Sequence, residues 1–544
     1  MLQDEIRTFF RGEIADDEAA RATYSRDASV FEVRPELIAF PKDSEDVGRL
    51  VRFVAEKKPS LPALSLTPRS AGTDMSGGPL GESIIVDFAK HFTRIHEVSD
   101  GYAITEPGVF YRDFEKETLR RGYFLPSYPA SRELCTVGGM VANNAGGEKN
   151  LKYGKTEKYV ERLKVVMSDG EEYAVHPLTR DELEEKMRLE SFEGNIYRRL
   201  YALLEEHYDV IQKARPNVSK NSAGYYLWNV WNRERFDLAQ LFTGSQGTLG
   251  MITEITFRLA QKPAYSGMLV VYLKDMTHVG ELVNAVLPTG PSAFEAFDDE
   301  TLKLAFRFLP NFLQLLGAKN LFSLGIQFIP DLVIIALHGM PKLTLLIEFE
   351  EASQSAVREK LERLAQRLAR FRVQMRTART RAEANKYWAI RRESFNLLRH
   401  KIKDRQTAPF IDDFVVNPQT LPEFFPKLHE ILDRYALYST IAGHAGDGNF
   451  HIIPLMDLSK EAERAKIPKV AEEVYRLVLS YKGSITAEHN DGLIRSPYLG
   501  AMYGEAVCAL FEKVKNIFDP LNIFNPGKKV GSSLAYAFAH LKRG

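Results

Sequence analysis

Over the first half of the chain, short apolar runs alternate with stretches of helical periodicity. Leu37–Phe40 is one such run; it predicts a strand that Pro41 ends. Ser44 then predicts the N-cap of a helix, because apolar residues recur after it at the spacing of one helical face. The same patterns predict helical, partly polar structure in residues 1–35, strands at 84–88 and 102–108, and a helix at 111–121. This half therefore predicts an α/β region.

From Pro263 the pattern changes. Continuous apolar runs at 268–273 and 343–349 predict buried strands, and residues 351–371 and 381–400 predict long helices. These elements indicate a second, α+β domain.

The region Leu302–Pro341 is unusually apolar for a loop, but charged residues and prolines interrupt it before it reaches the length of a membrane span. It is expected to be core, an oligomer interface or a contact with a membrane surface.

Composition narrows the class of protein. The 544 residues are 44% hydrophobic and 26% charged with zero formal net charge, which is typical of a globular protein of two or three domains and gives no indication of nucleic-acid binding. The two cysteines, Cys135 and Cys508, are too few for a disulfide framework or an iron–sulfur cluster. The N-terminus has no apolar signal segment, so a cytoplasmic, reducing location is expected.

Three glycine-rich segments carry candidate chemistry. In Leu64–Gly78 a strand leads into small residues whose backbone N–H groups suit an anion such as a diphosphate, although a plain surface loop is the alternative. Leu134–Gly147 contains fourteen uncharged residues with four glycines, and Phe242–Thr253 is similar. Such segments indicate close approach of the backbone to a flat or bulky group, or glycine-rich turns packed against protein. None of them is a Walker loop or a GxGxxG fingerprint.

Taken together and in order, these segments resemble the FAD-linked oxidase family, the vanillyl-alcohol-oxidase-like or PCMH-type flavoproteins. The resemblance runs from Ile38 to Phe257 and returns in the closing motif Phe518–Lys528. It implies a two-part FAD-binding domain at residues 1–262, a substrate-cap domain with an antiparallel sheet and a helical C-terminal part at 263–500, and a segment at 501–544 that returns to the FAD domain. The residues that the resemblance assigns to FAD are Pro68, Arg69, Ser70, Ala71, Gly72, Thr73, Asp74, Ser76, Thr136, Gly138, Gly139, Asn144, Ala145, Gly146, Gly244, Ser245, Gly247, Thr248, Gly250, Ile252 and Asn525.

Small departures accompany the resemblance. Gln246 stands where the family has Glu, and Met140 where it has Asn. The diphosphate loop lacks the histidine that often accompanies covalently attached flavin, so non-covalent FAD is expected. The segment Lys220–Tyr225 also resembles a family segment, but the sequence assigns it no role.

Two histidines bracket a glycine-rich turn in Gly443–His451. If Asp447 and Gly448 form a two-residue hairpin turn, His444 lies directly opposite His451, with Cβ atoms about 4.5–5.5 Å apart. That distance suits two imidazoles that share a metal ion, and it equally suits two hydrogen-bonded structural histidines.

An arginine occupies an apolar helical stripe in the second domain. Arg391 lies in the middle of this stripe, so it needs an anionic partner. That partner is expected to be an internal Asp or Glu, for which Asp412 or Asp413 would serve, or the carboxylate of a substrate held bidentately. The stripe consists of Ala384, Trp388, Arg391, Phe395 and Leu398.

Residues of this second domain resemble the family branch that oxidises D-2-hydroxy acids, which includes D-2-hydroxyglutarate dehydrogenase, D-lactate dehydrogenase and the glycolate oxidase flavin subunit. The resemblance implies that Arg391 clamps the substrate carboxylate and that His489 is the catalytic base. His444, His451 and Glu488 match the ligands of a divalent metal, for which zinc is expected and manganese or iron are alternatives.

Three apolar residues depart from the resemblance. Phe395 and Phe410 stand where 2-hydroxyglutarate enzymes have polar contacts to a second carboxylate, which favours a lactate- or glycolate-like 2-hydroxy acid over a dicarboxylic acid. Ile453 stands where several relatives place a polar residue.

Two other interpretations stay open. The chain is alternatively a flavin oxidase for another alcohol or amine, with structural histidines. It is also compatible with an FAD-binding subunit that docks an iron–sulfur partner through Leu302–Pro341. The same region is a candidate for homo-oligomer contact or for peripheral contact with the inner face of the membrane. The expected electron acceptor is a quinone, an electron-transfer flavoprotein or an iron–sulfur partner.

Overall fold

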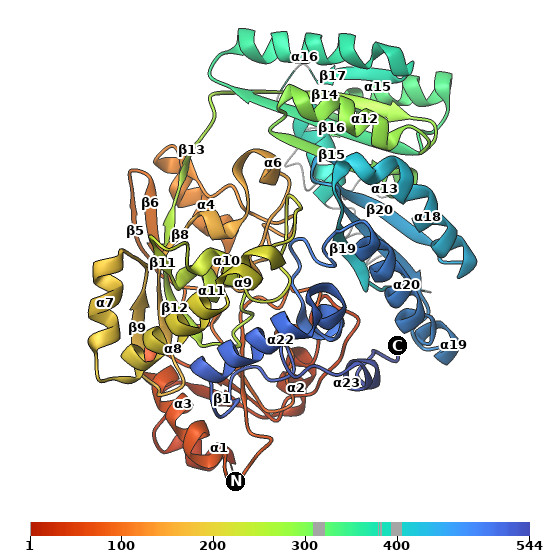
Figure 1. The fold of residues 1–544 in the computed structure, drawn as a ribbon. Helices are drawn as coiled ribbons and strands as arrows, with labels where there is room; N and C mark the ends of the chain where they lie inside the picture. Colours follow the sequence, from red (N-terminus) through yellow and green to blue (C-terminus); the bar gives the residue numbers. More distant parts are fainter. Residues whose placement is uncertain (1, 308–320, 379, 381–382, 393–404) are drawn as a thin grey trace.

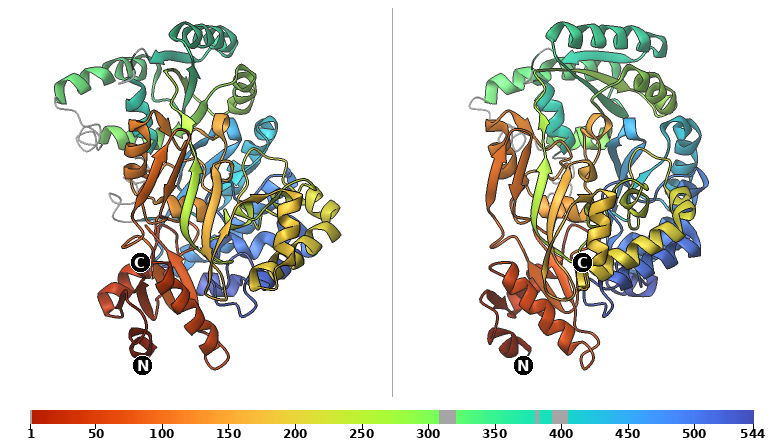
Figure 2. Two further views of the ribbon diagram at one scale, coloured as in Figure 1. Left: turned by 90° about the vertical axis from the view of Figure 1, so that its left-hand side faces the viewer. Right: turned by 60° about the vertical axis from the view of Figure 1, so that its left-hand side comes forward.

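The computed structural model describes residues 2–307, 321–378, 380, 383–392 and 405–544. Within them the larger sheets have four, five and eight strands. Figures 1 and 2 show the eight-stranded sheet, with α16 (Gln354–Leu368), at one end of the molecule and the N-terminal four-stranded part at the opposite end. The mixture of helices with mostly antiparallel sheets confirms the α+β fold class.

The four-stranded sheet has the order β1-β2-β4-β3, in which β2, β4 and β3 are parallel. β3 therefore delivers its carboxyl end, Arg69, to the edge of the sheet where ligands of α/β proteins bind. Helix α3 starts at Ser44 but is capped by Asp43, whose side chain accepts from the Asp46 N–H, so the predicted cap was wrong by one residue. The predicted helical start of the chain is interrupted by β1. The elements of this part are α1 (Leu2–Arg7), β1 (Glu13–Ala15), α2 (Glu18–Tyr24), β2 (Leu37–Phe40), α3 (Ser44–Lys57), β3 (Leu66–Arg69) and β4 (Ile84–Asp87).

The five-stranded sheet is antiparallel, with the order β5-β6-β12-β8-β9. Buried and partly exposed residues alternate along β12, as expected for a strand with one face on a core. Helix α22 (Leu499–Phe518), near the C-terminus, returns to this part and packs beside α8 and α9 (Figure 1). The strands of this part are β5 (Ile95–Ser99), β6 (Tyr102–Thr105), β7 (Tyr123–Phe124), β8 (Val160–Val166), β9 (Glu172–Val175), β10 (Pro177–Leu178), β11 (Phe236–Asp237), β12 (Met251–Arg258) and β13 (Ala260–Gln261). Its helices are α4 (Tyr111–Arg120), α5 (Val137–Asn143), α6 (Asn150–Tyr153), α7 (Arg180–Arg188), α8 (Phe192–Glu206), α9 (Tyr208–Ala214), α10 (Leu227–Val230) and α11 (Ala239–Phe242).

The eight-stranded sheet is antiparallel, with the order β17-β14-β16-β15-β20-β21-β18, and β19 also pairs with β21. Strands β14 and β16 are buried on both faces over most of their length, which explains their continuous apolar runs. Alternate residues of β14 belong to two different cores, one under helices α12, α16, α18 and α20 and one that includes residues of α13, α15 and the helix at 383–392. The strands are β14 (Tyr265–Leu273), β15 (Ala293–Asp298), β16 (Leu343–Glu351), β17 (Gln374–Ala378), β18 (Gln406–Thr407), β19 (Ile411–Val415), β20 (Ser439–His444) and β21 (Asn449–Met456). The remaining helices are α12 (Val279–Val286), α13 (Asp299–Arg307), α15 (Leu321–His338), α18 (Leu421–Arg434), α19 (Glu461–Arg464), α20 (Lys466–Ser480), α21 (Gly492–Arg495) and α23 (Leu534–Ala539).

Two predictions for this sheet's surroundings need correction. The described parts of Leu302–Pro341 are mainly helical, as α13 and α15, rather than a loop. The long helix predicted at 351–371 begins later, at Gln354, because residues 343–351 continue as one strand. Of the helix predicted at 381–400, residues 383–392 are helical and the others, including Phe395 and Leu398, lie outside the described residues. In the part of the chain that the structure describes, no helix is both long and apolar enough to cross a membrane.

Candidate functional site

One cavity connects the part of the molecule that is expected to bind FAD (residues 1–262) with the eight-stranded sheet of the expected cap domain, called the cap sheet below. Its volume is about 730 Å³, within the usual range for a small-molecule site. Glycine-rich segments line one end, and residues of β20, β21 and the 488–489 loop line the other. The predicted site residues that line it are Pro68, Arg69, Ser70, Ala71, Gly72, Thr73, Asp74, Thr136, Gly138, Gly139, Ala145, Gly146, Gly247, Gly250, Ile252, Arg391, His451, Glu488 and His489.

The side chain of Asp74 fixes the conformation of the loop after β3, which lines this cavity. One carboxylate oxygen of Asp74 accepts from the backbone N–H groups of Ser76, at 3.0 Å, and Gly78, at 2.8 Å. The hydroxyl groups of Ser70 and Thr136 lie 2.6 Å apart and join this loop to the start of α5. Arg69 donates to two backbone carbonyls at the end of α2, so its guanidinium braces the loop.

The glycines of the cavity wall carry no side chains, which leaves room there for a large, flat group. A Cβ atom added to Gly139 would lie 3.4 Å from the hydroxyl groups of Ser70 and Thr136, over the cavity wall. A Cβ added to Gly247 would lie 2.1 Å from Pro68, so only glycine allows these two lining segments to approach. These features, with the open backbone of the Asp74 loop, satisfy what a bound dinucleotide requires.

Six of the predicted FAD residues do not line the cavity but fasten the segments that do. Asn525 donates from its amide to the carbonyls of Gly78 and Gln246, and Ser76 donates to Asp74. Asn144 adopts a left-handed conformation that ends α5. The six residues are Ser76, Asn144, Gly244, Ser245, Thr248 and Asn525.

The histidine hairpin has a different register from the one predicted. His444 pairs with Asn449, and Ala442 pairs with His451, so the loop contains four residues instead of two. Gly448 closes this loop with φ +71°, and a Cβ there would lie 2.0 Å from the Val416 carbonyl oxygen. A register change of two residues leaves every side chain on its original face. Both histidines therefore still face the same side, as diagonal neighbours with ring centroids 5.1 Å apart.

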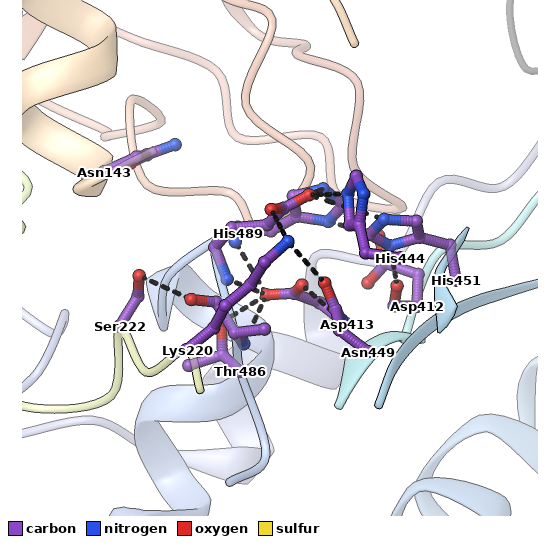
Figure 3. A network of polar contacts seen from close by, with 12 residues as sticks. Asn143, Lys220, Ser222, Asp412, Asp413, His444, Asn449, His451, Thr486 and His489 are labelled. Atoms are coloured by element: carbon purple, nitrogen blue, oxygen red, sulfur yellow. Dashed lines mark hydrogen bonds and ion pairs between the residues drawn. The ribbon is translucent and has the colours of Figure 1, made fainter. Parts of the chain in front are cut away.

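The imidazoles of His444 and His451 lie beside each other in Figure 3, and both face one carboxylate oxygen. Glu488 Oε1 lies 2.9 Å from His444 Nε2 and 3.4 Å from His451 Nε2. Burial lowers the pKa of His451, which favours the neutral, ligating form of its ring. Although burial alone would raise the pKa of Glu488, His444 and Lys220 hold it well below its usual range. Two imidazole nitrogens and a carboxylate form a donor set that suits a divalent metal with an open position.

Partners on the far side of each ring fix its orientation. His444 Nδ1 lies 2.7 Å from Glu295 Oε1, and His451 Nδ1 donates to the Asp412 carbonyl oxygen at 2.6 Å. Such partners set the tautomer that presents Nε2 to a metal. The sequence analysis did not single out Glu295, because it lies on β15, far from the hairpin in sequence.

His489 lies beside this cluster with the environment of a base. Its ring stacks on His451, with centroids 4.9 Å apart, and its Nδ1 lies 2.8 Å from Asp412 Oδ2. Arg495, which is fully buried, pairs with the other oxygen of Asp412. Burial lowers the pKa of His489, but the carboxylates of Asp413 and Asp412 outweigh it and raise this pKa to about 9. A pKa of about 9 keeps most of the ring protonated at neutral pH. Nε2 is therefore basic only in the fraction of molecules whose ring has lost one proton, with the remaining proton on Nδ1 toward Asp412.

Asp413 also lies within reach of the cluster, since Asp413, His451, Glu488 and His489 have ligand atoms within 4.8 Å of one another. However, Asp413 Oδ2 already accepts from the Thr486 hydroxyl and from the backbone N–H groups of residues 487, 488 and 489. This carboxylate therefore positions the loop that bears Glu488 and His489, and His444 is the better third ligand.

The predicted substrate arginine lines the cap end of the cavity, and the internal acidic residue that pairs with it is Glu295. Arg391 is 7% exposed and donates from Nε to Glu295 Oε2 at 3.1 Å, whereas Asp412 and Asp413 serve the 488–489 loop. Arg392 also lines the cavity and pairs with the buried Glu148.

The apolar residues that depart from the relatives lie in different places. Ile453 lines the cavity. Phe410 is fully buried in the core under α20 and does not line it, so its use in the substrate argument was wrong. Phe395 lies outside the described residues.

Comparisons with known proteins agree with this geometry. Residues 35–175 match a family model described as "FAD binding domain", and residues 262–529 match one described as "FAD linked oxidases, C-terminal domain". The chain is 27% identical to D-2-hydroxyglutarate dehydrogenase of Escherichia coli, with 97% of this chain and 51% of that protein covered. It is 26% identical to glycolate oxidase subunit GlcD of Bacillus subtilis, with 94% and 93% covered. It is 27% identical to D-lactate dehydrogenase of Archaeoglobus fulgidus, with 93% and 96% covered.

The chain spans about half the length of the D-2-hydroxyglutarate dehydrogenases of Escherichia coli, Pseudomonas putida, Pantoea ananatis and Haemophilus influenzae. Among solved structures, 4-ethylphenol oxidase from Gulosibacter chungangensis superposes with a TM-score of 0.68 at 14% identity, covering 95% of this chain and 94% of that one. p-Cresol methylhydroxylase superposes with a TM-score of 0.65 at 16% identity and the same coverage. At these identities the superpositions establish the fold alone.

Proposed function

Because this chain belongs to the family of FAD linked oxidases, we propose that it is an FAD-dependent dehydrogenase that oxidises a D-2-hydroxy acid to the 2-oxo acid. The observation that carries the proposal is the continuity of one cavity, from the Asp74 loop to His451, Glu488 and His489. A flavin site and a polar cluster suited to a hydroxyl substrate thus share one chamber. The relatives named as dehydrogenases or oxidases of 2-hydroxy acids support the same class of substrate.

FAD would be held without a covalent bond by the glycine-rich segments of residues 68–74, 136–146 and 247–252 that line the cavity. When bound, it supplies the hydride acceptor for the substrate's Cα hydrogen. In the described part of the lining, the only imidazoles are those of His451 and His489, which serve the polar cluster.

A divalent metal, with zinc expected and manganese or iron as alternatives, would be held by His444, His451 and Glu488. When bound, it supplies a Lewis acid that lowers the pKa of a substrate hydroxyl. The fit rests on three donor atoms that converge on one point and on the outer partners of both imidazoles.

The protein's own side chains then have defined tasks. His489 Nε2 accepts the proton of the 2-hydroxyl, while Asp412 holds the other proton of the ring at Nδ1 and stabilises the imidazolium. Arg391, oriented by Glu295, binds the substrate carboxylate at the cap end of the cavity. Ile453 provides an apolar wall, which favours a short or apolar side chain on the substrate, as in lactate or glycolate.

The test is a screen of D- and L-2-hydroxy acids for anaerobic bleaching of the bound flavin. We expect D-lactate, glycolate or a related monocarboxylic acid to bleach the flavin, and the L enantiomers to leave it oxidised. A flavin that dithionite reduces but that no 2-hydroxy acid bleaches would refute the assignment.

A second candidate is an FAD-binding subunit of a larger complex. It is favoured by the coverage of nearly the whole glycolate oxidase subunit of Bacillus subtilis. Such a subunit would copurify with an iron–sulfur protein, and turnover with the natural acceptor would require that partner. Full turnover by the isolated chain with a quinone would exclude this candidate.

A further inference from the structure

Lys220 is a cation buried inside the polar cluster, on a segment to which the sequence assigned no role. Its side chain is 0% exposed, and its ammonium lies 2.9 Å from Glu488 Oε2. Figure 3 shows the end of the Lys220 side chain between His489, His444 and Asn449. The carboxylates of Glu488 and Asp447 both face the ammonium. Lys220 comes from the FAD-binding part, whereas the groups that it contacts come from the cap.

The two oxygens of Glu488 have different surroundings. Oε1 faces the imidazoles of His444 and His451. Oε2 accepts from Lys220, and a Cβ added to Gly146 would lie 3.0 Å from this oxygen, so the backbone of Gly146 closes the same side. A carboxylate held in this way offers one oxygen toward the histidines and keeps the other on the ammonium.

Lys220 also contacts the loop between the two histidines. Its ammonium lies 3.6 Å from Asp447 Oδ2 and 3.4 Å from Asn449 Oδ1. Asn449 is fixed by donating to the Phe414 carbonyl oxygen at 3.0 Å, and Asp447 by accepting from Asn150 at 3.0 Å. The polar residues of the hairpin loop and Glu488 therefore meet at one cation, which connects the two chain segments that bear the candidate ligands.

Building on the proposed function, we propose that Lys220 is a positioning residue that keeps Glu488 a one-oxygen ligand of the metal and keeps the site electron-poor. Its positive charge draws electron density from the carboxylate and repels the metal. The site thereby gives up some affinity for the ion and gains Lewis acidity toward the substrate hydroxyl. A lysine with a merely structural role would support the metal, so its loss would weaken metal binding.

The test replaces Lys220 in the FAD-loaded enzyme and measures zinc binding by competition with a chelator. Lys220→Met removes both the charge and the hydrogen bond, Lys220→Gln keeps a donor without charge, and Lys220→Arg keeps the charge. We expect the zinc dissociation constant to fall by at least about tenfold in the Met and Gln variants and to stay near the wild-type value in the Arg variant. Flavin reduction by substrate is expected to slow in the two neutral variants despite their tighter zinc.

A second readout separates geometry from charge. Zinc K-edge X-ray absorption, to which the flavin does not contribute, reports the number of oxygen and nitrogen ligands. We expect an added oxygen ligand in Lys220→Met, where Oε2 becomes available, and wild-type coordination in Lys220→Gln and Lys220→Arg. If Lys220→Met fails to fold with FAD, the zinc affinity of Lys220→Gln decides the proposal by itself.

The outcomes separate this proposal from the proposed function. Unchanged or weaker zinc binding in the neutral variants would overturn the role of Lys220 and leave the dehydrogenase assignment standing. A wild-type enzyme that binds no divalent metal, or whose flavin no 2-hydroxy acid reduces, would instead refute the proposed function.

Discussion

Asp412→Asn tests whether the base acts through its carboxylate partner. Asp412 Oδ2 lies 2.8 Å from His489 Nδ1, and a hydrogen bond between charged groups contributes about 1.5–3 kcal/mol. Once His489 holds the substrate proton, this bond joins an imidazolium to a carboxylate, so its loss raises the barrier to that step. The same energy corresponds to a decrease of about 10- to 160-fold in rate. The backbone carbonyl of Asp412, which orients His451, is unaffected by the substitution.

The assay is stopped-flow reduction of the flavin under anaerobic conditions at saturating 2-hydroxy acid. Flavin content and unfolding must be measured in parallel, because the buried Arg495 keeps only an amide oxygen as acceptor and some stability is lost. Asp237→Asn is the matched control, since Asp237 is a buried aspartate that lies outside the cavity lining. Flavin reduction within about twofold of wild type in Asp412→Asn would refute the proposed Asp412–His489 relay.

Three further outcomes follow from the geometry. Removal of the metal by a chelator is expected to stop flavin reduction by substrate without releasing FAD, and zinc or manganese should restore it; a chelated enzyme at full rate would contradict a catalytic metal. Gly146→Ala places a Cβ 3.0 Å from Glu488 Oε2, so zinc affinity and the rate of flavin reduction are expected to fall, whereas Gly500→Ala, with open space around its Cβ, should change neither. Lys149→Met removes the lysine shared by the buried Glu348 and Glu350 and leaves Glu348 without its lysine partner, so it is expected to cost about 3–5 kcal/mol of unfolding free energy. Lys152→Met, at a 38% exposed side chain on one of the same glutamates, should cost less than about 1 kcal/mol, and equal losses would contradict the burial argument.

Local features of the fold were readable from the sequence because local sterics and burial determine them. The apolar run Leu37–Phe40 forms β2, and the helical spacing after it forms α3, as predicted. The glycine-rich segments around Gly72, Gly139 and Gly247 also line one cavity, because glycine at such positions marks close approach of the backbone. The faces of His444 and His451 were predicted correctly even though the register was not, since a shift of two residues preserves the side-chain face.

The ion pairs of the site depended on tertiary structure. Asp412 and Asp413, which follow Arg391 along the chain, were the candidate internal partners for it. In the structure Arg391 pairs with Glu295, which lies on β15, the strand that pairs with β20. Lys220 reaches Glu488 across two parts of the molecule, and no periodicity in the sequence relates these residues. A buried charge pairs with whichever opposite charge the packing of distant segments brings to it. The sequence by itself therefore determined which elements form and which side chains could bind a flavin and a metal, while only the packing of the cap sheet against the FAD-binding part decided which charges hold those side chains in place.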